Sequence, residues 1–277
     1  MDNKELFLKH QGQTTPYPLC MEVSKASGLY ITDTSGKKYL DLVAGVSACA
    51  IGHCHPRIVK AVQEQAASYM HVMVYGEFIQ SPQLQLAKKL ASVLPDSLNS
   101  SYFVNSGTEA IEGAMKLAKR STGRSEMISC DLSYHGSTQG TLSIMGTEHY
   151  KQKYRPLLPD CNRIVYNEIS SLRLITSKTA AVIIEPVQGA SGFRTPENNY
   201  LQEVRKRCTE VGALLIFDEI QTCYGRTGSL FGFQTYEVVP DILCIAKGMG
   251  GGMPIGAFIC SSALMSKLKD NPKLGHI

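Results

Sequence analysis

The chain has 277 residues, of which 28 are Lys or Arg and 24 are Asp or Glu, so its formal net charge is +4. Hydrophobic residues make up 43% of it, enough to bury a sizeable core in one large or two smaller domains. This composition excludes a disordered chain and a collagen-like repeat. The basic excess is small and contains no run of five Lys or Arg residues, so we expect no nucleic-acid partner and no membrane-surface partner.

The longest apolar stretches, such as 213–217, have the length of a strand and are far shorter than a membrane span. The N-terminus also lacks the continuous apolar segment of a signal peptide, so we expect a cytoplasmic protein. Nine cysteines without a C-x-x-C pair argue against a disulfide framework. The cluster at 53–55, His-Cys-His, superficially looks like a metal site, but adjacent ligands rarely converge on one ion, so no metal is expected.

In chain order, the first fifty residues predict a small β element, because 28–42 reads as two strands joined by a turn. Amphipathic helices are then expected over Pro56–Tyr69 and Ser81–Leu94. From about residue 100, β-rich runs alternate with helical stretches, chiefly Thr108–Ser121 and Pro196–Val211, as in an α/β domain with a largely parallel sheet. The seven expected strands are Ser101–Val104, Glu126–Asp131, Arg163–Tyr166, Ala180–Glu185, Ala213–Asp218, Asp241–Ala246 and Gly256–Ser261.

We expect ligands to bind at the strand-to-helix junctions, because an α/β sheet binds ligands outside the carboxyl ends of its strands. The segment Asn105–Glu109 follows the first strand and opens a helix, where free N–H groups and the helix dipole favour a phosphate. The same pattern is common as a simple helix cap. Asp218 ends a very apolar strand, where a carboxylate either has a functional role or caps the next helix.

Two further junctions carry reactive or aromatic side chains. Lys247 ends an apolar strand before a glycine-dense loop; it is either a Schiff-base lysine or an ordinary lysine that reaches solvent. Tyr134 and His135 follow the second strand and precede Gly136, a pattern that a core tyrosine beside a hydrogen-bonded histidine explains equally well. Taken together, the four junctions offer a phosphate anchor, a stacking ring, a carboxylate and a lysine, the set that pyridoxal 5′-phosphate needs.

The ordered motifs resemble those of the class III aminotransferases, the acetylornithine, ornithine and 4-aminobutyrate aminotransferase family of the type I pyridoxal-phosphate fold. The motifs are Gly52–Pro56, Asn105–Glu112, Tyr134–Gly136, Glu185–Gly189, Asp218–Gln221, Gly225–Gly228 and Ala246–Gly248. The resemblance implies an α/β fold with a seven-stranded, mostly parallel sheet, flanking helices and a small N-terminal β element. It also implies that residues 1–50 are the N-terminal segment of a small domain and that residues 51–277 are the large cofactor-binding domain.

Carried over position by position, the resemblance makes Lys247 the Schiff-base lysine, which would also move the proton between cofactor carbon and substrate carbon. Asp218 would keep the pyridine nitrogen of the cofactor protonated. Gly107 and Thr108, with Ser106 beside them, would hold the phosphate. These assignments name the two catalytic residues and the phosphate anchor.

The remaining site residues would surround the cofactor ring. Tyr134 would stack on the ring with His135 next to it, Gln221 would contact the ring hydroxyl, and Glu185 would support the site. The implied activity is transfer of an amino group from an ω-amino or basic amino acid, of the acetylornithine, ornithine or 4-aminobutyrate type, to a 2-oxo acid such as 2-oxoglutarate. Same-fold alternatives are an aminomutase, a diamine or β-amino-acid transaminase, and a non-catalytic binding protein.

Two departures from the family pattern bear on this expectation. Ala190 stands where ornithine-type members commonly have a glutamate, so we expect a substrate profile different from theirs. Cys223 replaces a common glycine. The resemblance also implies a homodimer, with Tyr69–Gln80 facing the partner. After Ile277 it implies a segment whose threonine binds the cofactor phosphate of the partner subunit, followed by a C-terminal small domain; without these, we expect weak or no catalysis.

Overall fold

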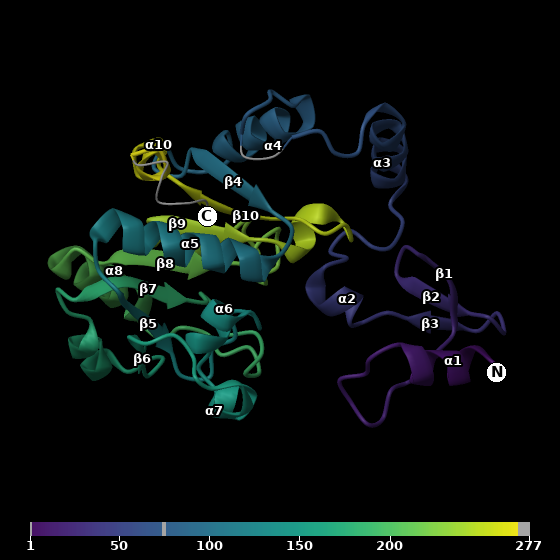
Figure 1. Cartoon of the computed structure of the whole chain (residues 1–277), viewed down its shortest axis with the longest axis horizontal. Coiled ribbons are helices and arrows are strands. Elements are labelled where there is room, and N and C mark those ends of the chain that lie inside the picture. Colours follow the sequence, from purple (N-terminus) through teal and green to yellow (C-terminus); the bar gives the residue numbers. More distant parts are fainter. Residues whose placement is uncertain (1, 74–75, 271–277) are drawn as a thin grey trace. The chain divides into compact units, whose positions relative to one another are not determined.

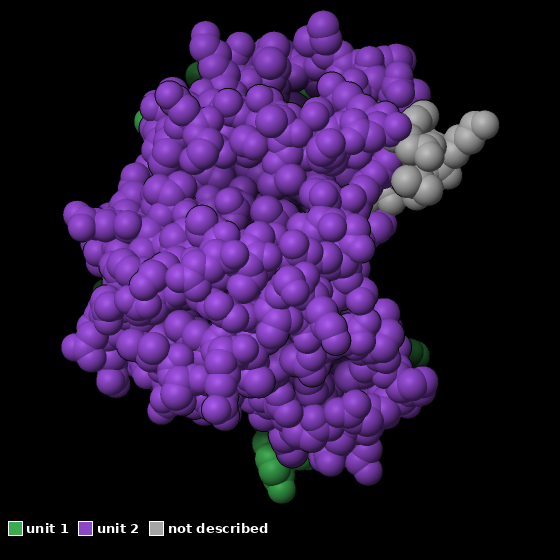
Figure 2. Space-filling view, turned by 90° about the vertical axis from the view of Figure 1, so that its left-hand side faces the viewer, with its two compact units in different colours: residues 1–72 green, residues 73–277 purple. Residues whose placement is uncertain are grey.

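The computed structural model describes residues 2–73 and 76–270 (Figure 1). The backbone divides into two compact units, Met1–Val72 and Met73–Ile277, which Figure 2 separates by colour. The domain boundary expected near residue 50 stays a prediction, because backbone compactness is a different criterion from domain identity. Among the described residues, no helix has the length and apolar character needed to span a bilayer.

The first unit is built on a three-stranded antiparallel sheet in the order β1-β2-β3. Its elements are α1 (Asn3–His10), β1 (Val23–Ser27), β2 (Tyr30–Asp33), β3 (Lys38–Leu40), α2 (Ala44–Ser47) and α3 (Pro56–Ser68). The expected hairpin is present as β2 and β3, whereas β1 and α1 were not predicted. The carboxylate of Asp33 fixes the hairpin turn, because it accepts hydrogen bonds from the N–H groups of Ser35 at 2.9 Å and Lys37 at 3.0 Å.

The second unit contains a seven-stranded sheet in the order β4-β10-β9-β8-β7-β5-β6. β10 runs antiparallel to both of its neighbours, and the other strands run parallel to one another. The strands are β4 (Ser100–Val104), β5 (Glu126–Cys130), β6 (Cys161–Ile164), β7 (Thr179–Ile184), β8 (Leu214–Asp218), β9 (Ile242–Ile245) and β10 (Gly256–Cys260). Each corresponds to an expected strand; β6 begins two residues earlier than expected and ends two residues earlier.

Helices cover this sheet. They are α4 (Ser81–Ala91), α5 (Gly107–Thr122), α6 (Gln139–Ser143), α7 (Glu148–Lys151), α8 (Tyr200–Val211), α9 (Gly232–Tyr236) and α10 (Ser262–Met265), with 3-10 turns η1 (Gln152–Tyr154), η2 (Ile169–Leu174), η3 (Lys247–Gly250) and η4 (Ser266–Leu268). The expectation that the helix before β8 begins at Pro196 is wrong. Asn198 adopts a left-handed φ of 48°, which interrupts a right-handed helix, so α8 begins at Tyr200.

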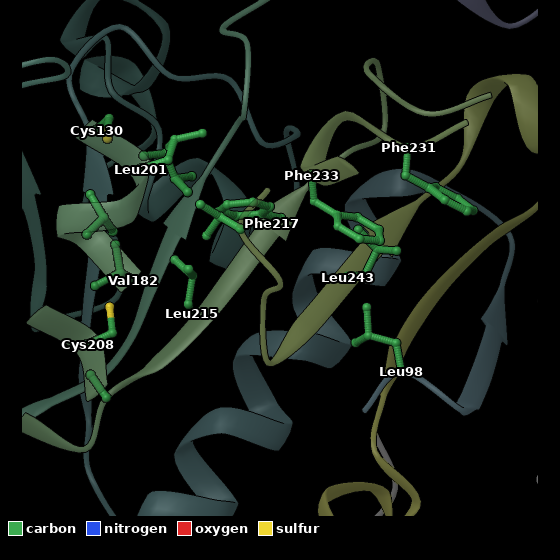
Figure 3. Close-up of a cluster of buried hydrophobic side chains, with 14 of the residues drawn as sticks. Leu98, Cys130, Val182, Leu201, Cys208, Leu215, Phe217, Phe231, Phe233 and Leu243 are labelled. Carbon is green, nitrogen blue, oxygen red and sulfur yellow. The ribbon is translucent and has the colours of Figure 1, made fainter. Parts of the chain in front are cut away.

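Strands β7 and β8 bury side chains on both faces, as expected for central parallel strands. On one face, Ile183 and Ile216 pack in a cluster with the apolar side of α5. On the other face, Leu215 and Phe217 pack in a cluster with α8 residues that include Leu201 (Figure 3). Phe217 is fully buried, which contributes about 2–3 kcal/mol relative to leaving it exposed.

The strand directions place several junctions along one edge of the sheet. Because β4, β5, β7, β8 and β9 run parallel, their carboxyl ends lie at the same edge, and the chain leaves each strand there. In the register of β8 and β9, Asp218 lies opposite Cys244. In the pairing of β10 with β4, Gly256 lies opposite Val104. The carboxyl edge therefore gathers the residues that the sequence singled out.

Candidate active site

The N-terminus of α5 presents unpaired donors at the carboxyl edge. Ser106 caps the helix, since its hydroxyl accepts a hydrogen bond from the N–H of Glu109 at 3.3 Å. The Glu109 carboxylate reaches back and accepts from the N–H of Asn105 at 2.7 Å. The N–H groups of Gly107 and Thr108, the first two helical residues, have no carbonyl partner within the helix. This end of α5 is therefore suited to an anion such as a phosphate.

Thr108 belongs to a hydroxyl cluster that the sequence did not predict. Its Oγ1 lies 2.9 Å from Oγ1 of Thr138 and 2.9 Å from Oγ1 of Thr141. The carboxylate oxygen Oε1 of Glu112 accepts from the Thr138 hydroxyl at 2.5 Å. The same oxygen accepts from the N–H groups of Gly140 at 2.9 Å and Thr141 at 3.1 Å. The start of α5 is thus tied to the start of α6.

A buried ion pair lies at the tip of β8. Asp218 is 4% exposed, and its Oδ2 lies 2.8 Å from Nδ1 of His135, while its Oδ1 accepts from the N–H of Ile220. Burial lowers the pKa of His135, but the hydrogen bond to Asp218 and the charges of Asp218 and Glu185 outweigh it, so the net pKa is raised. The hydrogen bond to Asp218 therefore favours the protonated form of His135.

The other ring nitrogen of His135 is orphaned. Its Nε2 is buried and has no hydrogen-bond partner among residues 2–73 and 76–270. A buried polar atom without a partner costs about 1–3 kcal/mol, so such an atom marks a place where a ligand or water completes the structure. The unpartnered Nε2 of His135 is therefore one feature that fits a bound cofactor.

Glu185 connects the exits of two strands. Its Oε1 accepts from the N–H of Tyr134 at 2.9 Å, and its Oε2 accepts from the N–H of Gly189 at 3.1 Å. Burial raises the pKa of Glu185 to about 7, with the charge of Asp218 adding to the shift and that of His135 opposing it. Tyr134 keeps its ring 41% exposed, so the backbone of Tyr134 is fixed while its ring stays accessible.

Glycines allow several segments of the site to approach one another closely. A Cβ on Gly107 would lie 2.7 Å from Cδ1 of Ile220, and a Cβ on Gly189 would overlap the side-chain amide of Gln221. A Cβ on Gly256 would lie 2.5 Å from the carbonyl oxygen of Ser106. Glycine at these positions permits the close approach of the segments that carry the site.

Lys247 begins η3, directly beyond β9, next to the strand that ends in Asp218. It is half-buried and has a left-handed φ of 44°, a conformation that costs a non-glycine residue energy and is often found at functional sites. Within the described part of the chain, no hydrogen bond or ion pair engages its Nζ. Cys223 is buried nearby, with Sγ 3.8 Å from the carbonyl oxygen of Ala246.

Some of the expected site residues therefore contact one another, whereas others only lie at the same carboxyl edge of the sheet. Asp218 contacts His135, and Glu185 contacts Tyr134. Lys247 and the N-terminus of α5 share the edge with them through the strand order. Glu112, Thr138 and Thr141 were missed, because sequence spacing does not reveal contacts between α5 and α6.

An orphaned buried nitrogen, a strand-tip carboxylate, an unpaired lysine and an anion-binding helix end fit pyridoxal 5′-phosphate, and the sheet has the fold of type I pyridoxal-phosphate-dependent transferases. The model of the family "Aminotransferase class-III" matches residues 12–275. The chain belongs to the class III aminotransferases, whose cofactor is pyridoxal 5′-phosphate.

Two relatives illustrate the similarity. The chain is 41% identical over 263 residues to the acetylornithine aminotransferase of Methanopyrus kandleri, covering 94% of this chain and 66% of that protein. It is 36% identical over 250 residues to the [LysW]-aminoadipate semialdehyde/glutamate semialdehyde transaminase of Sulfurisphaera tokodaii, covering 90% of this chain and 64% of that protein. The chain thus spans less than two thirds of the length of either relative.

Solved structures agree with the fold. The ornithine aminotransferase of Toxoplasma gondii superposes with a TM-score of 0.89 at 28% identity, covering 100% of this chain and 68% of that one. An amine transaminase from an uncultivated Pseudomonas species, solved with pyridoxal phosphate bound, superposes with a TM-score of 0.87 at 27% identity, covering 95% and 67%. The expected fold class is confirmed.

Proposed function

We propose that this chain forms the cofactor-binding part of an aminotransferase that moves an amino group from an ω-amino or basic amino acid to a 2-oxo acid such as 2-oxoglutarate. The donor class is that of acetylornithine, ornithine and 4-aminobutyrate. The observation that carries the proposal is the buried Asp218, bonded to His135 at 2.8 Å, on the strand next to the one that leads into Lys247. A buried carboxylate needs a hydrogen-bonding partner, and His135 supplies one.

Pyridoxal 5′-phosphate, when bound, supplies a conjugated ring that accepts the electron pair released when a C–H bond of the amino donor breaks. Asp218 would hold a proton on the ring nitrogen, and the hydrogen bond with His135 would orient the Asp218 carboxylate. Lys247 Nζ would hold the cofactor aldehyde and then carry the proton that leaves the donor carbon. The left-handed φ of Lys247 supports this role, because such strained conformations cluster at functional sites.

The remaining residues would bind and orient the cofactor. Gly107 and Thr108 would bind the phosphate through their N–H groups at the start of α5, with the hydroxyl of Ser106 beside them. The half-exposed ring of Tyr134 would cover the cofactor ring. Two further side chains complete the assignment: Gln221 would contact the ring hydroxyl, and Glu185 would support the site by fixing the backbone of the Tyr134 segment.

A homodimer is part of the proposal. The segment Tyr69–Gln80 was expected to face a partner, and Val74 and Tyr75 within it lie outside the described residues. After them, the neighbouring residues Phe78 and Ile79 of the second unit are 55% and 91% exposed. Large exposed apolar side chains that lie close together in sequence favour a protein partner. The cytoplasm is the proposed compartment, since all nine cysteines are free thiols.

The activity is tested by adding amino donors to the protein saturated with pyridoxal phosphate. N-acetylornithine, ornithine, 4-aminobutyrate, β-alanine and a diamine are offered in turn, the cofactor absorbance is followed, and glutamate formed from 2-oxoglutarate is measured. We expect a spectral change with at least one ω-amino donor and only slow formation of glutamate. Bound cofactor without any donor response would contradict the proposal and favour a non-catalytic binding protein; the best response with a diamine or β-alanine would favour the alternative transaminase class.

A further inference from the structure

Glu112 makes three hydrogen bonds with groups from another helix. One oxygen of its half-buried carboxylate accepts from the Thr138 hydroxyl and from the N–H groups of Gly140 and Thr141. Thr138 is the N-cap residue of α6, yet its own side chain makes no capping bond. Glu112 therefore caps α6 from α5, in place of the local side chain.

The groups that Glu112 holds are the neighbours of Thr108. The hydroxyls of Thr138 and Thr141 lie 3.0 Å apart, and each lies 2.9 Å from Oγ1 of Thr108. Since the Thr138 proton is donated to the Glu112 carboxylate, Thr138 meets Thr108 as an acceptor. Thr108 and Glu112 are four residues apart and so share one face of α5. The position of the Thr108 hydroxyl thus depends on where Glu112 holds Thr138 and Thr141.

Two glycines show how closely these groups pack. A Cβ on Gly140 would overlap the carboxylate of Glu112, and a Cβ on Gly136 would overlap the side chain of Thr108. Gly136 also has a φ of 127°, which side-chain-bearing residues rarely adopt. The Glu112 carboxylate and the Thr108 side chain thus lie directly against the backbone of Gly140 and Gly136.

We propose that Glu112 is a positioning residue for the phosphate end of the cofactor site. Its carboxylate holds the first turn of α6 and the hydroxyls of Thr138 and Thr141, and these hold the Thr108 hydroxyl beside the free N–H groups that begin α5. Glu112 itself touches no ligand. The inference rests on the proposed function, in which Thr108 binds the cofactor phosphate.

A pair of ligands isolates this role. Pyridoxal 5′-phosphate and pyridoxal share the ring and the aldehyde and differ in the phosphate, so the ratio of their dissociation constants measures the phosphate site alone. For Glu112→Ala, we expect the affinity for pyridoxal 5′-phosphate to fall by about tenfold, the equivalent of one hydrogen bond to a charged group, while pyridoxal affinity changes by less than about twofold. Glu112→Gln keeps one acceptor oxygen and should lose less.

The matched control is Glu126→Ala at the opposite end of the strands. Glu126 also accepts from a threonine hydroxyl, that of Thr179 at 2.6 Å, but it lies at the start of β5. A variant that only loosens the fold, as we expect of Glu126→Ala, should lower the affinities for pyridoxal 5′-phosphate and pyridoxal equally or leave both unchanged. Equal weakening of the two ligands by Glu112→Ala, or unchanged affinity for pyridoxal 5′-phosphate, would overturn the inference.

Two further arms keep the test decisive. If circular dichroism shows that Glu112→Ala does not fold, Gly140→Ala takes its place, because the added methyl group displaces the same carboxylate. A loss of affinity for pyridoxal 5′-phosphate but not for pyridoxal, in both Gly140→Ala and Glu112→Gln, would support the role of Glu112. Unchanged affinity for pyridoxal 5′-phosphate, or an equal loss for both ligands, would overturn it. A wild-type protein that binds pyridoxal 5′-phosphate no better than pyridoxal would instead overturn the proposed function, and this inference with it.

Discussion

The two edges of the seven-stranded sheet use charged side chains in different ways. At the amino edge, the guanidinium of Arg124 donates to three carbonyl oxygens, those of Thr179, Val211 and Gly212, at 2.9–3.1 Å. Asp241 there accepts from the backbone of β8 and from an arginine at 2.7 Å. These charged groups meet partners from the fold itself, so they tie strands and loops together.

At the carboxyl edge, charge is buried without being fully paired. The His135–Asp218 pair leaves Nε2 of His135 without a partner among the described residues, and Glu185 and Glu219 are buried carboxyl groups whose pKa is raised to about 7. Perturbed groups gathered in this way cluster at functional sites. The charged groups of the amino edge therefore hold the fold together, while the carboxyl edge leaves Nε2 of His135 available to a ligand. The predictions below test that division.

The largest effect is expected for Lys247→Ala. Loss of the only nucleophile assigned to the cofactor aldehyde should abolish covalent attachment and slow amino transfer by about a hundredfold to ten-thousandfold, the range of a lost proton-transfer catalyst. Attachment is measured by borohydride reduction and rate by glutamate formation. Lys60→Ala, at a 76% exposed side chain on α3, serves as the control and should behave as wild type. Full activity of Lys247→Ala would break the assignment of the carboxyl edge.

Asp218→Asn should have the next largest effect. An amide cannot keep the cofactor ring nitrogen protonated, so we expect cofactor binding to remain largely intact and transamination to slow by about tenfold to a hundredfold. Single-turnover rates with the best amino donor measure the change. The equivalent substitution at the amino edge, Asp241→Asn, should leave these rates unaltered. Wild-type turnover in Asp218→Asn would refute the role of Asp218.

Arg124→Ala examines the amino edge. Removal of a guanidinium that donates to three carbonyl oxygens should lower the free energy of unfolding by about 1–3 kcal/mol. The dissociation constant of pyridoxal phosphate, measured under conditions where the variant is folded, should not change. Urea titration gives the first quantity and absorbance titration the second. Weakened cofactor binding with unchanged stability would reverse the proposed division between the edges.

The smallest effect concerns Glu219, which is fully buried and accepts bonds from the N–H groups of Gly232 and Phe233. Burial raises its pKa from 4.5 to about 7, so between these values the folded state binds more protons than the unfolded state. Stability from this group is thus fully present below pH 4.5 and is lost as the pH rises through about 7. Glu219→Gln should remove up to about 1.4 kcal/mol per pH unit of that decline.

The measurement for Glu219→Gln is the free energy of unfolding between pH 5 and 7, with the 67% exposed Glu64→Gln as control. A pH slope identical to that of wild type would show that Glu219 does not titrate in this range. Only the slope is diagnostic, because the amide also disturbs the two hydrogen bonds at the start of α9.

The sequence predicted most of the fold, because the central strands of the second unit are apolar runs, and β5, β7 and β8 end at or directly before an acidic residue. It placed Asp218 and Lys247 at one edge for the same reason. The pairing of Asp218 with His135 joins residues 83 positions apart, and no local pattern specifies such a contact. Glu112 was quoted within a motif, but its role depends on Thr138, which approaches it through tertiary packing. The sequence predicts the start of α8 too early, because the spacing of apolar residues does not reveal the left-handed conformation of Asn198.

The central claim is that the carboxyl edge binds pyridoxal phosphate with Lys247 as its covalent anchor. The most direct test is to saturate the wild-type protein with the cofactor, reduce it with borohydride, digest it and map the modified peptide by mass spectrometry. We expect a phosphopyridoxyl group on Lys247 and on no other lysine. Modification of a different lysine, or none at saturating cofactor, would contradict it.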